Sequence, residues 1–341
     1  MLTVKTIDAH AGGGPLRLVV DGFPAPSGAT MADKGEWVMR HADHLRRALL
    51  LEPRGHADMV GAVLTEPVSP GSHAGLVFLH GEGCAPLSGH GVIAATTIAL
   101  ERGLVMPGND GLTVVYDTAA GTVRARATPR PGGHDRTPPG SLDARIERVS
   151  FVNVPSFVVQ GGLAVSALGR RIRADVAFAG AFFGIVDAEA AGLAVDGRYL
   201  PELRRAGPAI AEAIEAASPL PRLGGRAQRL HATIFTGPPR DETAALRSVA
   251  VFAGGQAGRA PSGTGTAAVM AVLDAMGLLA PDAPFVHEGL IGTRFIGRLT
   301  GRTLVGEHDA IVPAIEGSAW ITGEQTLRLH ETDPLRQGFR P

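Results

Sequence analysis

The sequence predicts an α/β (α+β) protein built from two similar lobes. Three observations support this prediction: many short strand-like runs, only a few long helical stretches, and a motif that recurs about half a chain later. The chain has 341 residues, of which 45% are hydrophobic. A chain of this length and composition buries most of its apolar surface, usually in about two domains.

The predicted strands are rich in β-branched residues and are bounded by Gly or Pro. The N-terminal residues 1–10 alternate like a strand and lack the charged and apolar regions of a targeting signal. Residues 149–169 contain Asn153, Pro155 and Gln160, so they read as two short strands rather than as a membrane helix. The other predicted strands are 16–21, 59–65, 75–80, 112–116, 122–127, 148–152, 232–236, 247–252 and 303–307.

Four stretches are patterned as helices: 34–51, 89–102, 199–218 and 265–276. The third is amphipathic, because Leu203, Ile210 and Ile214 share one face with charged residues between them. Many strands with a few long helices are typical of an α+β or mixed α/β protein. The Pro/Gly-rich residues 130–140 are expected to form a mobile surface loop.

The recurring motif joins residues 88–104 to residues 262–278 without gaps, at a constant offset of 174. Both copies read Ser-Gly-x-Gly, then an apolar helix, then Gly-Leu. Ser88 and Ser262 are suited to cap the two helices through their side-chain oxygens. The repeat therefore predicts two similar lobes, each presenting a helix N-terminus at the same place.

A helix N-terminus carries unpaired N–H groups and attracts anions. Two such termini, with Ser88 and Ser262 on opposite sides, would suit a small carboxylate whose Cα lies between two acid/base groups. The simpler interpretation is that each serine is only a helix cap. A P-loop is excluded because neither copy has Lys after its second Gly, and a Rossmann motif because neither reads G-x-G-x-x-G.

Charge and cysteine content exclude several classes of protein. The net charge is −1, which gives no reason to expect nucleic acid or an anionic membrane as a partner. The single cysteine, Cys84, excludes an internal disulfide framework and a cysteine metal cluster. Without a targeting or membrane segment in view, the sequence predicts a cytoplasmic location.

Five segments resemble the proline racemase family, which includes hydroxyproline 2-epimerase and trans-3-hydroxy-L-proline dehydratase. The opening segment is His-Ala-Gly-Gly-Gly from residue 10. Two others resemble the family's catalytic motifs, Met-Cys-Gly-His-Gly and Asp-Arg-Ser-Pro-Cys-Gly-Thr-Gly-Thr. The matching segments are 7–19, 87–91 (Leu-Ser-Gly-His-Gly), 259–266 (Arg-Ala-Pro-Ser-Gly-Thr-Gly-Thr), 288–297 and 319–323.

The resemblance implies the diaminopimelate epimerase fold, with two pseudo-twofold-related lobes and the active site in the cleft between them. We expect residues 1–178 to form the first lobe and 179–317 the second, with about 318–341 returning to the first. The resemblance implies no cofactor and no metal. It implies a small proline derivative as substrate. A homodimer is the assembly to be tested.

The resemblance also assigns site residues by position. Ser88 and Ser262 occupy the two slots whose side chains flank the substrate Cα, one removing a proton and the other supplying one. The substrate carboxylate would be bound mainly by backbone N–H groups, those of Gly89, His90, Gly263 and Thr264.

The chain departs from the family by having serine in both slots, where racemases have cysteine. A serine hydroxyl is a much weaker acid than a thiol and needs a neighbouring base. His90 is a candidate for that base, whereas Cys84 is expected to be a buried spacer. His10 and His231 are expected to be packed or hydrogen-bonded histidines rather than catalysts.

A second departure concerns the family's Asp that pairs with the ring ammonium of the substrate. Gly258 stands in its place. Losing a charge-assisted partner would weaken binding, unless another carboxylate replaces it. Glu82, Asp175 and Asp187 are the candidates for that replacement.

Three functions follow as hypotheses. The first is a cofactor-independent hydro-lyase, a trans-3-hydroxy-L-proline dehydratase giving Δ1-pyrroline-2-carboxylate, which needs only one base and one weak acid. Residues 181–183 (Ala-Phe-Phe) favour it, because they resemble the dehydratases more than the racemases. The second is an isomerase, either a 4-hydroxyproline 2-epimerase or a proline racemase. The third is a catalytically degenerate binder of a small cyclic amino or oxo acid.

Overall fold

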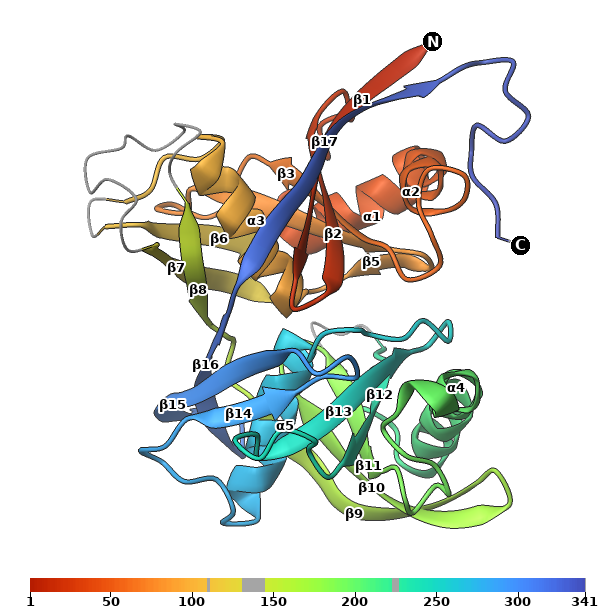
Figure 1. Ribbon diagram of the computed structural model, residues 1–341, viewed down its shortest axis with the longest axis vertical. Coiled ribbons are helices and arrows are strands. Elements are labelled where there is room, and N and C mark those ends of the chain that lie inside the picture. Colours follow the sequence, from red (N-terminus) through yellow and green to blue (C-terminus); the bar gives the residue numbers. More distant parts are fainter. Residues whose placement is uncertain (109–110, 131–144, 223–226, 341) are drawn as a thin grey trace. The chain divides into compact units, whose positions relative to one another are not determined.

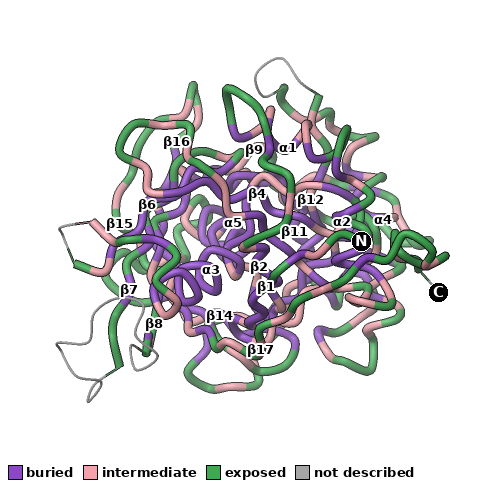
Figure 2. The backbone as a smooth tube through the Cα atoms, turned by 90° about the horizontal axis from the view of Figure 1, so that it is seen from above, coloured by how far each residue is buried: buried purple, intermediate pink, exposed green. Residues whose placement is uncertain are grey.

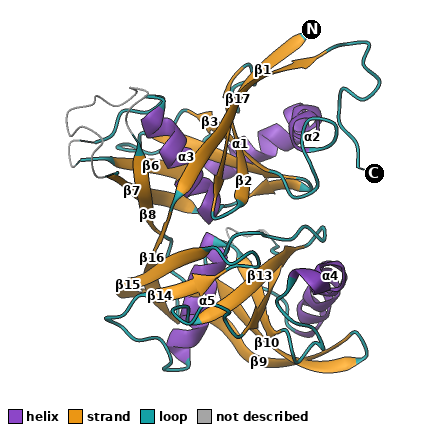
Figure 3. Ribbon diagram, viewed as in Figure 1, coloured by secondary structure: helices purple, strands orange, loops and turns teal. Residues whose placement is uncertain are grey.

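The chain folds into two units, each with its own strands, helices and apolar core (Figure 1). The computed structural model describes residues 1–108, 111–130, 145–222 and 227–340. Unit 1 comprises Met1–Phe151 and Glu316–Pro341, and unit 2 comprises Val152–Ile315. Both units mix strands with a few helices, so the predicted α/β class is confirmed (Figure 3).

The strands of unit 1 form a mixed sheet that begins with the two ends of the chain. β17 (Ala319–Leu329) pairs antiparallel with β1 (Leu2–Ala11), and β1 pairs antiparallel with β2 (Gly14–Asp21). Next to β2 lies β3 (Val60–Thr65), which runs parallel to it, and β4 (Ala74–His80) is antiparallel to β3. β6 (Thr113–Thr118) then pairs parallel with β4. Antiparallel pairings add β5 (Gly83–Ala85) to β4 and β7 (Gly121–Pro129) to β6, and β8 (Ile146–Val152) ends this part of the chain.

The first helical region of unit 1 differs from the single predicted helix 34–51. It consists of α1 (Met31–Trp37), a π-helical turn (Val38–Ala42) and α2 (Asp43–Leu50). The helix starts earlier than predicted because Thr30 and Asp33 form a capping box. The break comes at Ala42, whose backbone (φ −130°, ψ 15°) leaves the helical region.

The strands of unit 2 also pair with one another in both directions. β9 (Phe157–Ala167), β10 (Arg170–Phe178) and β11 (Phe182–Asp187) are successive antiparallel neighbours. The sheet then passes through β12 (Leu230–Gly237), parallel to β11, and β13 (Leu246–Phe252), antiparallel to β12. β14 (Phe285–Glu288) runs parallel to β13 and antiparallel to β15 (Arg294–Val305), and β16 (His308–Gly317) leads back to unit 1.

The helix α4 (Leu200–Ala217) covers the strands of unit 2 with its apolar face, as the sequence pattern predicts. Leu203, Ile210 and Ile214 are fully buried there and share a core with residues of β12 and β13. Burying three such side chains stabilises the unit by roughly 5–8 kcal/mol before entropy is counted. A short 3₁₀ turn (Gly197–Tyr199), capped by Asp196, precedes the helix.

The two helices of the repeat are buried almost all round, and both follow buried stretches of the tube in Figure 2. α3 (Gly89–Glu101) contacts β1, β2 and β17 in unit 1, and α5 (Gly263–Ala275) contacts β9, β10 and β15 in unit 2. A helix that is apolar on every side belongs inside a protein rather than on its surface. Each therefore starts at a serine that lies at the edge of its unit's core.

The division of the chain differs from the predicted boundary at residue 178. β9 and β10 lie before that boundary, but both belong to unit 2 because they pair with each other and with β11. The chain enters unit 2 after Phe151 and leaves it after Ile315, and β17 then pairs with β1.

Three smaller observations complete the fold. The predicted strand 303–307 is the end of β15 and its turn, rather than a separate strand. Residues 131–140 of the predicted loop lie outside the described residues. Among the helices of the described ranges, none is both long and apolar enough to cross a membrane.

Packing between α4 and β13 leads to a first prediction. A Cβ added at Gly207 would lie 2.5 Å and 2.6 Å from two carbons of Val251. We expect Gly207→Ala to destabilise the protein by about 1–2 kcal/mol, because overpacking outweighs the gain in helix propensity. Calorimetry should show a lower melting temperature.

The control is Gly197→Ala, because a Cβ at Gly197 meets no atom within 4 Å among the described residues. It should change the melting temperature by less than about 2 °C. A Gly207→Ala variant as stable as the wild type would contradict the packing described here.

Candidate functional site

The first predicted helix start is a serine cap in unit 1. Ser88 has an extended backbone (φ −130°, ψ 109°), and its Oγ accepts a hydrogen bond from the Gly91 amide at 3.3 Å. Its carbonyl accepts from the Val92 amide at 2.8 Å. These bonds begin α3 at Gly89, in agreement with the sequence pattern. The hydroxyl proton of Ser88 is not used by the cap and stays available to another acceptor.

The ring of His90 lies beside that hydroxyl. Its Nδ1 lies 3.4 Å from the Oγ of Ser88. Burial lowers the pKa of His90 to about 4, partly opposed by the Pro15 backbone, so the ring is neutral near pH 7. A neutral ring with an unprotonated Nδ1 is able to accept a proton from the serine hydroxyl. The structure therefore brings together the serine and the histidine that the sequence singled out.

The turn between β1 and β2 packs against the His90 ring. A Cβ added at Gly14 would lie only 3.0 Å from Cδ2 of His90, so this position leaves no room for a larger side chain. His10, in the same opening segment, accepts from the Gly13 amide at 3.3 Å and stacks on Trp320 at 5.3 Å. The opening segment thus positions the His90 ring, and His10 is a packed, hydrogen-bonded histidine.

The second predicted helix start is a serine cap in unit 2. The Oγ of Ser262 accepts from the Gly265 amide at 3.0 Å and lies 3.4 Å from the Oγ1 of Thr264. The Ser262 carbonyl accepts from the Thr266 amide at 2.6 Å. These bonds begin α5 at Gly263, two residues earlier than the predicted start at residue 265.

The two caps are alike, but the groups beside them differ. The residue two positions after Ser88 is a histidine, whereas the residue two positions after Ser262 is a threonine. Ser88 therefore has a ring nitrogen beside its hydroxyl, and Ser262 has a second hydroxyl. A neutral imidazole is a much stronger base than an alcohol. With Nδ1 unprotonated, the His90 ring is thus a proton acceptor beside Ser88. Among the described residues, the side chain hydrogen-bonded to the Ser262 hydroxyl is an alcohol and not an imidazole.

Gly258 lies in the loop before Ser262, and its amide donates to the Ala250 carbonyl at 2.8 Å. A Cβ added there would make only ordinary contacts, the nearest at 3.6 Å. Its φ lies outside the left-handed range that disfavours side chains. The position is therefore able to take an aspartate, although the chain has glycine.

The carboxylates expected to replace that aspartate lie elsewhere. Asp175 on β10 pairs with Ile185 on β11, which is two strands away from Ala250 on β13. Three strand spacings therefore separate Asp175 from Ala250, a distance of roughly 14 Å. Its Oδ1 accepts from the Gly162 amide. Asp175 is therefore not a neighbour of Gly258.

Asp187 and Glu82 are also committed to other partners. Asp187 is exposed at the end of β11 and accepts from the Glu189 amide at 2.8 Å. Glu82 lies in unit 1, at the turn between β4 and β5, and pairs with Arg340. Neither carboxylate is a neighbour of Gly258 within its own unit.

Cys84 has the properties of the expected spacer. Its Sγ lies 3.6 Å from the Gly35 carbonyl, and burial raises the pKa of the thiol to about 11. The thiol faces an apolar cavity of about 320 Å³ that is also lined by Met31 and Met39, but not by Ser88. A thiol that stays protonated at neutral pH is a poor nucleophile and a poor base.

His231 is packed between two aromatic side chains of unit 2. Its ring makes edge contacts with Phe183 at 5.6 Å and Phe252 at 5.0 Å. Among the described residues, no three His, Cys, Asp or Glu side chains come together in a way that could hold a metal ion.

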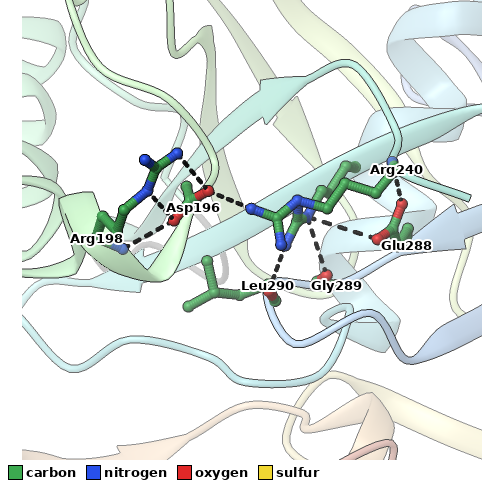
Figure 4. Close-up of polar contacts among 7 residues, drawn as sticks. Asp196, Arg198, Arg240, Glu288, Gly289 and Leu290 are labelled. Carbon is green, nitrogen blue, oxygen red and sulfur yellow. Dashed lines mark hydrogen bonds and ion pairs between the residues drawn. The ribbon is translucent and has the colours of Figure 1, made fainter.

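A buried polar network in unit 2 was not found from the sequence, although residues 288–297 were recognised as a motif. Arg247 and Glu288 are 3% and 2% exposed and lie 3.7 Å apart, and Glu288 also accepts from the Arg240 amide at 2.7 Å (Figure 4). Arg247 donates to the carbonyls of Gly289 and Leu290. The network holds this turn as a rigid segment.

The turn supports the loop that carries the second serine. A Cβ added at Gly289 would lie 2.7 Å from the nitrogen and Cδ of Pro261, the residue before Ser262. Only glycine therefore allows this approach. Contacts between a turn at residues 288–290 and a loop at residues 258–262 give no periodic signal, so sequence reasoning missed them.

The sequence is similar to those of characterised proteins along nearly its whole length. A family model described as proline racemase matches residues 6–340. The chain is 36% identical to a trans-3-hydroxy-L-proline dehydratase of Bacillus cereus, over 98% of this chain and 97% of that protein. It is 37% identical to a 3-hydroxyproline 2-epimerase of Burkholderia multivorans and 35% identical to a proline racemase of Clostridioides difficile, each over 99% of this chain and 98% of the relative.

Solved structures agree with these relatives. A hydroxyproline epimerase from Agrobacterium vitis with bound trans-4-hydroxy-L-proline matches with a TM-score of 0.89 and 28% identity, over 100% of this chain and 95% of that chain. A probable proline racemase from Agrobacterium radiobacter with bound carbonate gives 0.89 and 30%, over 99% and 96%. A PhzF-family protein of Bacillus anthracis, at 12% identity and a TM-score of 0.59 over 96% and 100%, shares the fold alone.

The burial of His90 leads to a prediction about stability and pH. The pKa of His90 is about 4 in the folded chain, against an ordinary value of 6.5. Between these pH values the unfolded chain binds a proton that the folded chain does not. The free energy of unfolding should therefore fall on acidification, by up to about 1.4 kcal/mol per pH unit for this group.

The variant His90→Gln removes this contribution. Its free energy of unfolding, from urea titrations between about pH 6.5 and 4.5, should fall less steeply than that of the wild type. His80 and His287, whose pKa values burial also lowers, to about 4 and about 3, contribute equally to both proteins. Identical slopes for the two proteins would show that His90 is not held neutral.

Proposed function

Because the chain belongs to the proline racemase family, we propose that it acts on a proline derivative by removing the α-proton, and that it is a cofactor-independent trans-3-hydroxy-L-proline dehydratase. The observation that carries this proposal is the difference between the two helix starts. Ser88 lies beside the ring nitrogen of His90, whereas Ser262 lies beside the hydroxyl of Thr264. One base and one weak acid are what an elimination of water requires.

In this proposal Ser88 and His90 form the base. The Ser88 hydroxyl gives its proton to Nδ1 of His90 while Oγ takes the α-proton of the substrate, so the pair gains one proton overall. The electrons of the Cα–H bond form a double bond between Cα and C3. His90 is neutral near pH 7 and thus has a lone pair for this step.

Ser262 acts as the acid in the same scheme. Its hydroxyl protonates the 3-hydroxyl of the substrate, the C3–O bond breaks, and water leaves. Thr264, 3.4 Å away, is placed to stabilise the serine oxygen with its own hydroxyl. The enamine product then tautomerises to Δ1-pyrroline-2-carboxylate. His90 releases its extra proton to solvent, and Ser262 takes one back.

The helix starts also account for binding of the substrate carboxylate. The first-turn amides of an α-helix have no partner inside the helix and favour an anion. Gly89 and His90 supply such amides in unit 1, and Gly263 and Thr264 supply them in unit 2. Since Gly89 and Gly263 have no side chain, nothing beyond the backbone would obstruct a ligand at these two positions.

Epimerisation at Cα is the second candidate function. The observation that favours it is the near identity of the two caps, with serine Oγ–amide distances of 3.3 Å and 3.0 Å. Relatives named as a 3-hydroxyproline 2-epimerase and a proline racemase support it as well. Epimerisation, however, needs Ser262 to act as a base in one direction. Among the described residues, the side chain that hydrogen-bonds to the Ser262 hydroxyl is that of Thr264, which is not a base.

The direct test is turnover of trans-3-hydroxy-L-proline in deuterium oxide, followed by proton NMR. The wild type should form Δ1-pyrroline-2-carboxylate, and Ser88→Ala and Ser262→Ala should each lower kcat at least about 100-fold. The control Ser218→Ala, at the C-terminal end of α4, should keep wild-type activity.

Other outcomes distinguish the alternatives. Deuterium at Cα with both epimers present and no pyrroline would replace the dehydratase by an epimerase or racemase. The protein is a binder without catalysis if it binds pyrrole-2-carboxylate but exchanges no Cα proton of any substrate tested. The substrates are proline, both hydroxyprolines and their oxo analogues.

Gly258 gives a prediction about affinity. A Cβ at this position makes only ordinary contacts, and an aspartate there would restore a partner for the ring ammonium. We expect Gly258→Asp to lower KM for trans-3-hydroxy-L-proline about 10-fold, the usual worth of a charge-assisted hydrogen bond. The matched control is Gly258→Asn, which has the same size without the charge and should change KM less than about threefold. Equal KM values for the two variants would show that no ammonium binds near residue 258.

A further inference from the structure

A chain of buried hydrogen bonds lies behind the second helix start. Nδ1 of His287, on β14, is 2.8 Å from Oγ1 of Thr266, on α5. That hydroxyl in turn donates to the Ser262 carbonyl at 2.8 Å. His287 and Thr266 are 1% and 0% exposed, so water does not compete for these bonds.

The direction of the bonds follows from counting protons. A threonine hydroxyl has one proton, and Thr266 gives it to the Ser262 carbonyl. Oγ1 is then an acceptor toward the histidine, so Nδ1 of His287 carries the ring proton. Nε2 is therefore the unprotonated nitrogen, and it has no hydrogen-bond partner among the described residues. Burial keeps the pKa of this ring at about 3, so the neutral form persists through the working pH range.

These bonds fix the peptide that follows the second serine. The Ser262 carbonyl accepts from the Thr266 amide at 2.6 Å and from the Thr266 hydroxyl at 2.8 Å. Two donors from one residue leave the carbonyl little freedom to rotate. Because His287 holds the Thr266 hydroxyl in place, the ring acts on the serine backbone through Thr266.

The first helix start lacks this support. The residue at the position of Thr266 in the repeat is Val92, whose amide donates to the Ser88 carbonyl at 2.8 Å. Valine has no hydroxyl to add a second bond, yet α3 is capped as well as α5. Capping a helix of this kind therefore does not require the histidine and threonine.

We propose that His287 is a positioning residue for Ser262, acting through Thr266 as its Nδ1–H tautomer. This inference rests on the proposed role of Ser262 as the acid. A weak acid works only when its proton points at the departing oxygen, so a shift of the Ser262 backbone by a fraction of an ångström costs rate. Ser88 has its partner beside its own hydroxyl and needs no such support.

The test compares variants that remove or keep each bond. Thr266→Val removes the hydroxyl that bonds to the Ser262 carbonyl, and His287→Leu removes the ring that bonds to Thr266. Thr266→Ser keeps the hydroxyl, and His287→Asn keeps a side-chain N–H donor. The matched control is Thr233→Val, which removes another hydroxyl of unit 2, one that is 0% exposed and bonded to the Gly207 carbonyl at 2.8 Å. All are assayed for kcat, KM and melting temperature as full-length proteins.

Thr266→Val and His287→Leu should lower kcat for dehydration about 10-fold or more, with KM changed less than about threefold. Thr266→Ser and His287→Asn should retain at least about a third of the wild-type kcat. Thr233→Val should lower the melting temperature and leave kcat unchanged. The proposal is overturned if Thr266→Val has the kcat of the wild type. It is also overturned if Thr233→Val lowers kcat as much as Thr266→Val does.

A second readout does not depend on activity. Nitrogen-15 NMR of the wild type should show that His287 is protonated on Nδ1 and bare on Nε2, and the opposite tautomer would overturn the proposal. The amide resonances of Gly263 and Gly265 should move in Thr266→Val and keep their positions in Thr266→Ser. If the wild type turns over no proline derivative, the proposed function fails, while these resonances still decide whether His287 positions the Ser262 loop.

Discussion

The hydrogen bond from a serine Oγ to the amide three residues later organises each unit of this protein. It starts α3 at Ser88 and α5 at Ser262, and both helices are buried almost all round. A buried helix end has no water for its unpaired amides, so it needs a cap or a ligand. The serine satisfies one amide of each buried helix end. This one local interaction therefore sets where the buried helix of each unit begins.

Around these two equal caps the chain has placed different side chains. His90 lies beside the Ser88 hydroxyl, whereas Thr264 lies beside that of Ser262. Thr266 and His287 support the Ser262 backbone, whereas Val92 gives Ser88 only a backbone bond. The two similar helix starts thus differ in the side chains that lie beside their serines.

The replacement of cysteine by serine changes what each unit must supply. A thiol at a helix start is acidic enough to act alone, while a serine hydroxyl depends on neighbours. The remaining thiol, Cys84, does not compensate, because burial raises its pKa to about 11. The side chains that touch the serines are His90 in unit 1 and Thr264 and Thr266 in unit 2.

The helix starts and the repeat could be predicted from the sequence, since a cap and a buried apolar helix depend on neighbours within a few residues. The amphipathic helix α4 and most strands were predictable for the same reason. The unit boundary after Phe151 was not, because it depends on which strands β9 and β10 pair with. The π-helical turn inside residues 34–51 also escaped prediction, since nothing in the local pattern interrupts that helix.

The positions of the two serines, and the helix that begins at each, follow from neighbouring residues, because capping is a local interaction. Which groups lie against the serines depends on how distant segments pack. This packing brought the turn at Gly14 against His90, His287 to Thr266 from another strand, and Gly289 against Pro261. Each of these contacts joins residues more than 20 positions apart in the chain. Such neighbours are chosen by strand pairing and packing rather than by the residues on either side, so no local pattern records them.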